Sequence, residues 1–223
     1  MQPRKRAKFA YLLAGLLVVL VAGPLVYEFT QQSASVVWQI AFSLTLVIGI
    51  WSLVDNRRWF IVGIVLVVAD VALTIVVLLN DSALAKILVT ALEVMFLSIS
   101  LVIALNHVLF GRGMDVNRII GAICVYLLLG ILLGIINANL FLFVPDSFNG
   151  IDSTEADIQG FTLIYYSFVT MTTLGYGDIT PAGPVARVVA YLAATAGQFY
   201  IAILVAMVVG QYLSQANARD DDG

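Results

Sequence analysis

The stretch 172–178 decides how the rest of this chain is interpreted, and it reads Thr172-Thr173-Leu174-Gly175-Tyr176-Gly177-Asp178. It lies between two long apolar segments and directly follows a short amphipathic segment. Gly175 and Gly177 stand at alternating positions, where they allow backbone angles that other residues adopt only with strain. A lone Gly-Tyr-Gly would be explained better as a glycine-rich turn between two helices. The full heptapeptide in this setting favours a specialised strand.

The composition is that of an integral membrane protein. Hydrophobic residues make up 61% of the 223 positions and charged residues only 11%, whereas a soluble domain is about a quarter charged. The net charge is −3, and the sequence shows no basic face for nucleic acid, so no nucleic-acid partner is expected. The single cysteine, Cys124, lies in an apolar run and is interpreted as a small buried residue.

Apolar runs predict an all-α membrane fold with six transmembrane helices, because a helix needs about 20 residues to cross the hydrocarbon. The predicted spans are 9–27, 36–54, 59–79, 83–110, 116–143 and 184–213. The segment 161–172 is too short to span and is typical of a re-entrant helix, which leads directly into the strand. Basic residues before the first run could mark a cleaved signal. The run is longer than a signal core, so we interpret it as a retained span.

Basic residues orient the predicted spans. With the N-terminus in the cytoplasm, the inner segments hold nine of the eleven Lys and Arg residues, and only Lys86 and Arg187 fall outside. This asymmetry fits the positive-inside rule and predicts cytoplasmic N- and C-termini. It also places the acidic loop before residue 160 on the outer side.

The heptapeptide TTLGYGD is similar to the selectivity filter of tetrameric potassium channels, usually written TVGYG followed by Asp. Residues 116–213 resemble the pore module of the bacterial, six-span members of that family. The resemblance implies that the carbonyls of Thr173, Leu174, Gly175 and Tyr176, with the Thr173 hydroxyl, replace the water shell of K⁺. It also implies that Gly177 and Asp178 close the outer mouth.

The resemblance extends to two tyrosines that would support the filter, and the chain departs from the family's pattern at two positions. Tyr165 and Tyr166 occupy aromatic positions whose rings would pack around the filter and whose hydroxyls could reach Tyr176 or Asp178. Leu174 replaces the usual valine, and its side chain is expected to point into the packing behind the filter. Val169 stands where some bacterial members carry a glutamate bonded to the filter aspartate, so that carboxyl pair is absent.

One filter motif per chain implies a C4 homotetramer, because a ring of K⁺ ligands needs four strands. Gly197 matches the hinge glycine of the family's inner helix, although a glycine here could equally serve close helix packing. Helix propensity alone makes Gly197→Ala a mild change. The apolar stretch 206–210 could form an inner constriction that closes by dewetting.

The domains expected from this resemblance are a four-helix membrane domain over 1–110, an intracellular linker over 111–115, a pore domain over 116–213 and a short acidic cytoplasmic tail over 214–223. The tail is expected to be disordered. The first domain has the layout of a voltage sensor without its charges, since the fourth span carries only Lys86 and His107 near its ends. We therefore expect no steep voltage dependence.

Asp70 and Glu93 form a predicted acidic pair near the middle of the third and fourth spans. Unpaired carboxylates at this depth are costly. The pair is interpreted either as a structural hydrogen bond that joins helices or as a sensor of protons or cations coupled to the pore.

The function predicted from these observations is passive, K⁺-selective conduction through a homotetramer in a plasma membrane of prokaryotic type. A weakly selective cation channel and a non-conducting partner subunit are the alternatives. No nucleophile–base pair or metal-ligand cluster indicates an enzyme. No cofactor is expected, and K⁺ is the permeant ion.

Overall fold

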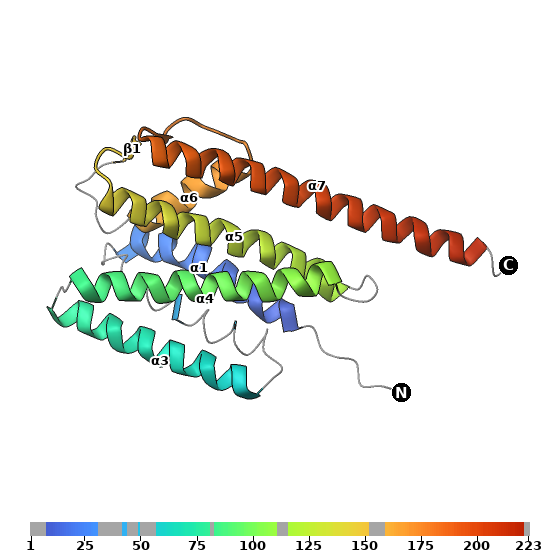
Figure 1. Cartoon of the computed structure of the whole chain (residues 1–223), viewed down its shortest axis with the longest axis horizontal. Coiled ribbons are helices and arrows are strands. Elements are labelled where there is room, and N and C mark those ends of the chain that lie inside the picture. Colours follow the sequence, from blue (N-terminus) through green and yellow to red (C-terminus); the bar gives the residue numbers. More distant parts are fainter. Residues whose placement is uncertain are drawn as a thin grey trace.

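The structure is a computed structural model that describes residues 8–30, 42–43, 49, 57–80, 83–110, 116–151 and 159–220. Its helices are α1 (Lys8–Thr30), α3 (Arg57–Asn80), α4 (Ala83–Phe110), α5 (Val116–Phe143), α6 (Gln159–Met171) and α7 (Pro184–Asp220). Two short strands, β1 (Phe148–Asn149) and β2 (Thr180–Pro181), pair in antiparallel fashion. Figure 1 shows the helices as a bundle from which the C-terminal part of α7 projects.

Four helices of the described part are long and apolar enough to cross a membrane, namely those that contain Phe9–Val26, Leu84–Phe110, Val116–Phe143 and Pro184–Met207. Shorter apolar segments lie in α3 and in α6, at Gly63–Val77 and Gly160–Met171. The predicted second span over 36–54 falls outside the described residues except for 42–43 and 49. The all-helical membrane class is confirmed in this coarser form, and the count of six spans stays a prediction.

The predicted helix limits agree with the structure at α4 and α5 and lie close to it at α1, α3 and α6. The expected disordered tail is wrong over residues 214–220, because α7 continues through Asp220. No glycine or proline lies between Leu213 and Asp220, so nothing in this sequence forces the helix to end at the membrane boundary. The two strands were also not predicted.

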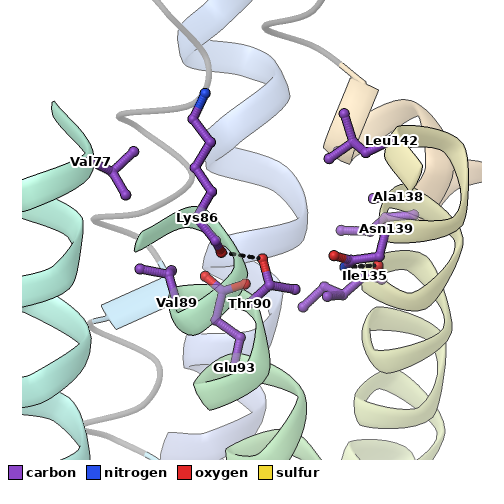
Figure 2. A pocket seen from close by; sticks show the side chains of 11 residues that line it. Val77, Lys86, Val89, Thr90, Glu93, Ile135, Ala138, Asn139 and Leu142 are labelled. Atoms are coloured by element: carbon purple, nitrogen blue, oxygen red, sulfur yellow. Dashed lines mark hydrogen bonds between the residues drawn. The ribbon is translucent and has the colours of Figure 1, made fainter. Parts of the chain in front are cut away.

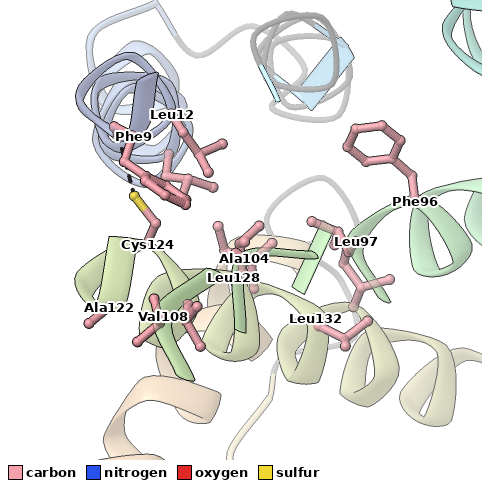
Figure 3. Close-up of a cluster of buried hydrophobic side chains, with 14 of the residues drawn as sticks. Phe9, Leu12, Phe96, Leu97, Ala104, Val108, Ala122, Cys124, Leu128 and Leu132 are labelled. Carbon is pink, nitrogen blue, oxygen red and sulfur yellow. Dashed lines mark hydrogen bonds between the residues drawn. The ribbon is translucent and has the colours of Figure 1, made fainter. Parts of the chain in front are cut away.

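Helix α5 is the centre of the fold and contacts α1, α4, α6 and α7. Its small and aliphatic residues, including Leu128, are buried against Leu12 of α1 and Leu97 of α4, as part of the core drawn in Figure 3. Cys124 is buried there as predicted, and its thiol lies 3.6 Å from the carbonyl oxygen of Phe9. The core therefore joins α1 and α4 to α5, the helix against which α6 packs.

Arg118 fixes the end of α4 against the start of α5. Its guanidinium is buried and donates to the carbonyl oxygens of Val108, at 2.6 Å, and Leu109, at 3.1 Å. These carbonyls belong to the last turn of α4, where intrahelical partners are missing. A cation at a helix C-terminus is also favoured by the helix dipole.

Candidate functional site

Helix α6 packs closely against α5 at two glycines of α5. A Cβ on Gly130 would collide with the ring of Phe168, and a Cβ on Gly134 would collide with Ile164. The two glycines are four residues apart, as are the two side chains of α6 that they receive, so one face of each helix meets the other. The two glycines form a Gly-x-x-x-Gly pattern, the small-residue pattern of close membrane-helix packing. The contact between α5 and α6 was not predicted from this pattern in the sequence.

A buried hydrogen bond also holds α6. The Asn137 amide on α5 donates to the Ser167 hydroxyl at 2.9 Å, and that hydroxyl donates to the Leu163 carbonyl oxygen at 2.8 Å. Asn137 and Ser167 are both almost completely buried. A hydrogen bond in such surroundings is costly to break, because it leaves a buried polar group without a partner. Sequence reasoning missed this pair, since neither residue stands in a motif.

The strand after α6 has an alternating backbone. Thr173, Gly175 and Gly177 have φ values of 58°, 57° and 80°, so every second residue lies in the left-handed region. Alternation of left-handed residues with residues of negative φ turns successive peptide groups toward a common side, unlike the two-sided arrangement of an ordinary strand. A Cβ on Gly175 or Gly177 would meet no atom within 4 Å. Backbone conformation within this chain therefore explains these glycines, and lack of space does not.

Backbone hydrogen bonds anchor the base of this strand on the end of α6. The Val169 carbonyl oxygen accepts from the amides of Leu174, at 3.0 Å, and Gly175, at 3.4 Å. The Thr172 hydroxyl donates to the Phe168 carbonyl oxygen at 2.8 Å. The negative end of the α6 dipole thus lies at the base of the strand, where it favours a cation.

Tyr165 supports the other end of the strand. Its hydroxyl donates to the Asp178 carboxylate at 2.7 Å, which is the contact that the sequence predicted. Its ring is nearly parallel to that of Tyr176, with centroids 6.5 Å apart. The hydrogen bond holds the pKa of Asp178 below its ordinary value of 3.8 and raises the pKa of Tyr165 to about 12. Asp178 is consequently ionised throughout the physiological pH range.

Tyr166 does not share this role. It is buried in a cluster with Leu163 and Ile179, and its ring meets Phe148 edge-on with centroids 5.3 Å apart. The prediction that both tyrosine hydroxyls reach the strand is therefore supported for Tyr165 alone. Successive residues of a helix point about 100° apart, and here the Tyr165 ring is directed to the strand and the Tyr166 ring to Phe148.

The segment after the strand is tied to the loop that follows α5. The Ser147 carbonyl oxygen accepts from the amides of Ala182, at 2.9 Å, and Gly183, at 3.3 Å. Gly150, with φ of 83°, lies so close to Asp178 that a Cβ would overlap its carbonyl oxygen. The β1–β2 pairing and these contacts fix where Asp178 leaves the strand.

The strand itself is open on the side away from α6. The side chains of Leu174 and Tyr176 are 55% and 66% exposed, and all residues from Thr172 to Asp178 are exposed. Leu174 is thus largely open in a single chain, and its packing behind the strand in an assembly stays a prediction. The apolar residues Tyr191, Leu192 and Phe199 of α7 are also exposed.

Gly197 lies where α7 crosses the end of α6. It is buried, and a Cβ there would collide with the carbonyl oxygen of Met171. The side-chain amide of Gln198 approaches the same oxygen at 3.5 Å. This geometry supports the packing alternative and overturns the expectation that Gly197→Ala is mild. Whether Gly197 also serves as a hinge stays a prediction.

Asp70 and Glu93 are both buried, with exposed fractions of 1% and 5%, and they are close enough to interact electrostatically. One Asp70 oxygen accepts from the Ser43 hydroxyl at 3.0 Å. Its other oxygen, Oδ1, has no hydrogen-bond partner among the described residues. A carboxyl–hydroxyl bond is therefore present, but it joins Asp70 to the segment before α3 and not to α4.

Comparisons with known proteins agree with this C-terminal site. A family model described as "Ion channel" matches residues 121–214, which contain α6, the strand and most of α7. The two pore potassium channel b of Oryza sativa subsp. japonica is 35% identical over 107 residues, which are 48% of this chain and 25% of that protein. The chain thus spans about a quarter of this relative's length. No solved structure gives a significant match.

The fold, the site and these similarities together define a helical, multi-pass membrane protein whose C-terminal part is similar to ion channels. The stretch 172–178 lies inside the matched region, between α6 and α7.

Proposed function

We propose that this protein conducts K⁺ passively and selectively through a homotetrameric pore. The observation that carries the proposal is the alternating backbone at Thr173, Gly175 and Gly177, in a strand whose exposed side has no cover within its own chain. Carbonyls from Thr173 to Tyr176, together with the Thr173 hydroxyl, would supply the oxygen ligands that replace the hydration shell. The similarity to a potassium channel supports K⁺ as the ion.

Four copies of the chain would complete the ring of oxygen ligands, of which one chain supplies a quarter. One strand provides one ligand at each level of the pore, and a ring of ligands needs several strands around an axis. The exposed Leu174, Tyr176 and Phe199 side chains would be covered in such an assembly, as expected of a closed cyclic oligomer. Helix α6 would then be a re-entrant helix, and the six-span arrangement would surround the pore in a plasma membrane.

Voltage would have little influence on this channel. Helix α4 carries Lys86 and His107 near its ends and a buried Glu93 between them, without arginine. One charge that crosses 100 mV gains about 2.3 kcal/mol, so steep gating needs several moving charges. The first four spans do not provide them.

The test is K⁺ flux into liposomes that contain only this protein, with reversal potentials measured in opposing K⁺ and Na⁺ gradients. K⁺ selectivity and a native mass of four chains are expected. Equal K⁺ and Na⁺ permeability would favour the weakly selective channel, which the replacement of the usual valine by Leu174 would explain. A protein that assembles but carries no ion would favour the partner subunit. Gly177→Ala is the matched negative control, because alanine strains the left-handed backbone there.

A further inference from the structure

A pocket of about 230 Å³ lies behind α6, between α3, α4 and α5. Glu93 and Thr90 of α4 face Asn139 of α5 across it, as Figure 2 shows. Gly160 and Ile164 of α6 complete its wall, so the pocket lies against the helix that positions the strand. It is smaller than the roughly 300–1,000 Å³ of pockets for drug-sized ligands, which indicates a compact occupant.

Two polar residues of this pocket, Thr90 and Asn139, keep acceptor oxygens. The Thr90 hydroxyl donates to the Lys86 carbonyl oxygen at 3.0 Å, and the Asn139 amide nitrogen donates to the Ile135 carbonyl oxygen at 2.7 Å. A hydroxyl has one proton, so the Thr90 oxygen keeps its lone pairs, and Asn139 keeps its side-chain oxygen together with one further N–H. Acceptor oxygens are thus present on both sides of the pocket, at Thr90 beside the Glu93 carboxyl group and at Asn139 across from it (Figure 2).

Charge and apolar surface define the ligand further. Glu93 is 5% exposed and close enough to Asp70 to interact electrostatically, so the floor of the pocket has acidic character. The remaining wall includes Val89 and Leu142. The Lys86 side chain extends away from the Glu93 carboxyl group (Figure 2) and is exposed. A ligand that fits donates several hydrogen bonds, carries positive charge and has a compact apolar body.

We infer that this pocket is a binding site for a small hydrophobic amine, whose ammonium group lies among Glu93, Thr90 and Asn139 and whose apolar body lies against Val89, Leu142 and Ile164. An ammonium group offers hydrogen-bond donors where the pocket offers acceptors, and charge-assisted bonds of this kind are the stronger ones. Binding does not depend on the proposed conduction. An effect on ion flux does, because the ligand would act through α6.

Gly160 provides a way to close the pocket without disturbing its surroundings. Gly160 lines the pocket and a Cβ on it meets no atom within 4 Å, so Gly160→Leu adds bulk at the pocket wall without a clash at Cβ. Glu93→Gln removes the acidic group at nearly constant shape. Asp146→Asn is the matched control for charge, because Asp146 is exposed and has a φ of 54° that asparagine tolerates.

The experiment uses the full chain in lipid nanodiscs and measures binding of 4-fluorophenethylamine by ¹⁹F NMR, with empty nanodiscs as the blank. Saturable binding of one amine per chain is expected. The neutral analogue 2-(4-fluorophenyl)ethanol and the Glu93→Gln protein should each bind about tenfold more weakly or worse, because a charge-assisted bond is lost. Gly160→Leu should abolish binding, whereas Asp146→Asn should leave it unchanged. Lys86→Gln should strengthen it, since a like charge is removed.

Several results would overturn the inference. Binding that does not exceed the blank would mean that lipid or nothing fills the pocket. Equal binding of amine and alcohol would remove the role of Glu93, and this comparison needs no variant to fold. One amine per four chains would indicate a site on the pore axis instead. Binding without any change in K⁺ flux would leave the site intact and contradict only its coupling to conduction.

Discussion

Gly197 of α7 lies directly against the backbone carbonyl of Met171, the last residue of α6. This contact joins the helix that would line the pore to the helix that positions the strand. No side chain lies between them, so the distance between the two backbones is set by the absence of a Cβ.

Gly197→Ala should therefore push α7 away from α6. Overpacking of this kind costs about 1–3 kcal/mol, more than the roughly 1 kcal/mol that alanine gains by helix propensity. The midpoint of thermal unfolding of the assembled protein should fall. Gly210→Ala on the same helix is the control, because Gly210 is exposed and has open space at its Cβ position. Normal stability with altered channel opening would instead support Gly197 as a hinge.

The seat of α6 on α5 gives a second prediction. Gly134→Ala should destabilise the protein by about 1–3 kcal/mol, because the new methyl group collides with Ile164. Ile164→Ala in the same protein removes Cγ1, the Ile164 atom nearest to the new methyl group, so the double variant should lose less stability than the sum of the two single variants. Denaturation of the two single variants and the double variant gives the coupling energy. Additive effects would show that the two side chains do not meet.

The sequence could predict the long helices and the special strand because both depend on local patterns. Apolar runs define α4 and α5, and the alternating glycines mark the strand. The contacts of Gly197 and Gly134 could not be predicted with the same certainty, because a glycine in an apolar helix signals close packing without naming its partner. The left-handed conformation of Thr173 could not be predicted, because threonine, unlike glycine, does not indicate a positive φ.

The end of α7 and the hydrogen bonds of buried polar groups were still harder to predict from the sequence. The extension of α7 beyond Leu213 was missed because hydropathy marks where apolar surface ends and not where a helix ends. Asp70 and Glu93 were recognised as buried acids from their depth alone. The Ser43 hydroxyl beside Asp70 could not be assigned, since it belongs to a segment whose packing no local pattern determines.

The bond between Ser43 and Asp70 yields a third prediction. Ser43→Ala should destabilise the protein by about 1–3 kcal/mol, because it removes the hydrogen bond to a carboxyl group that is 1% exposed. Asp70→Asn keeps an oxygen that can accept from Ser43 and should cost less. Thr74→Val is the control on α3, since the Thr74 hydroxyl donates to the Asp70 backbone oxygen and not to its carboxyl group. Equal stability of Ser43→Ala and the unmodified protein would exclude a structural role for the bond.

The bond between Tyr165 and Asp178 makes the outer end of the strand sensitive to pH in a defined direction. The Tyr165 hydroxyl holds the pKa of Asp178 below 3.8. Its contribution is therefore complete above pH 3.8 and is lost as the pH falls through the lowered pKa of Asp178. Tyr165→Phe removes the donor, so the pKa of Asp178 should rise. Carbon NMR of carboxyl-labelled aspartate can follow this pKa directly, and K⁺ flux at acidic external pH should fail earlier in the variant. Tyr166→Phe is the matched control, because the ring of Tyr166 packs on Phe148. The same Asp178 titration in both variants would contradict the assignment of this bond as the cause.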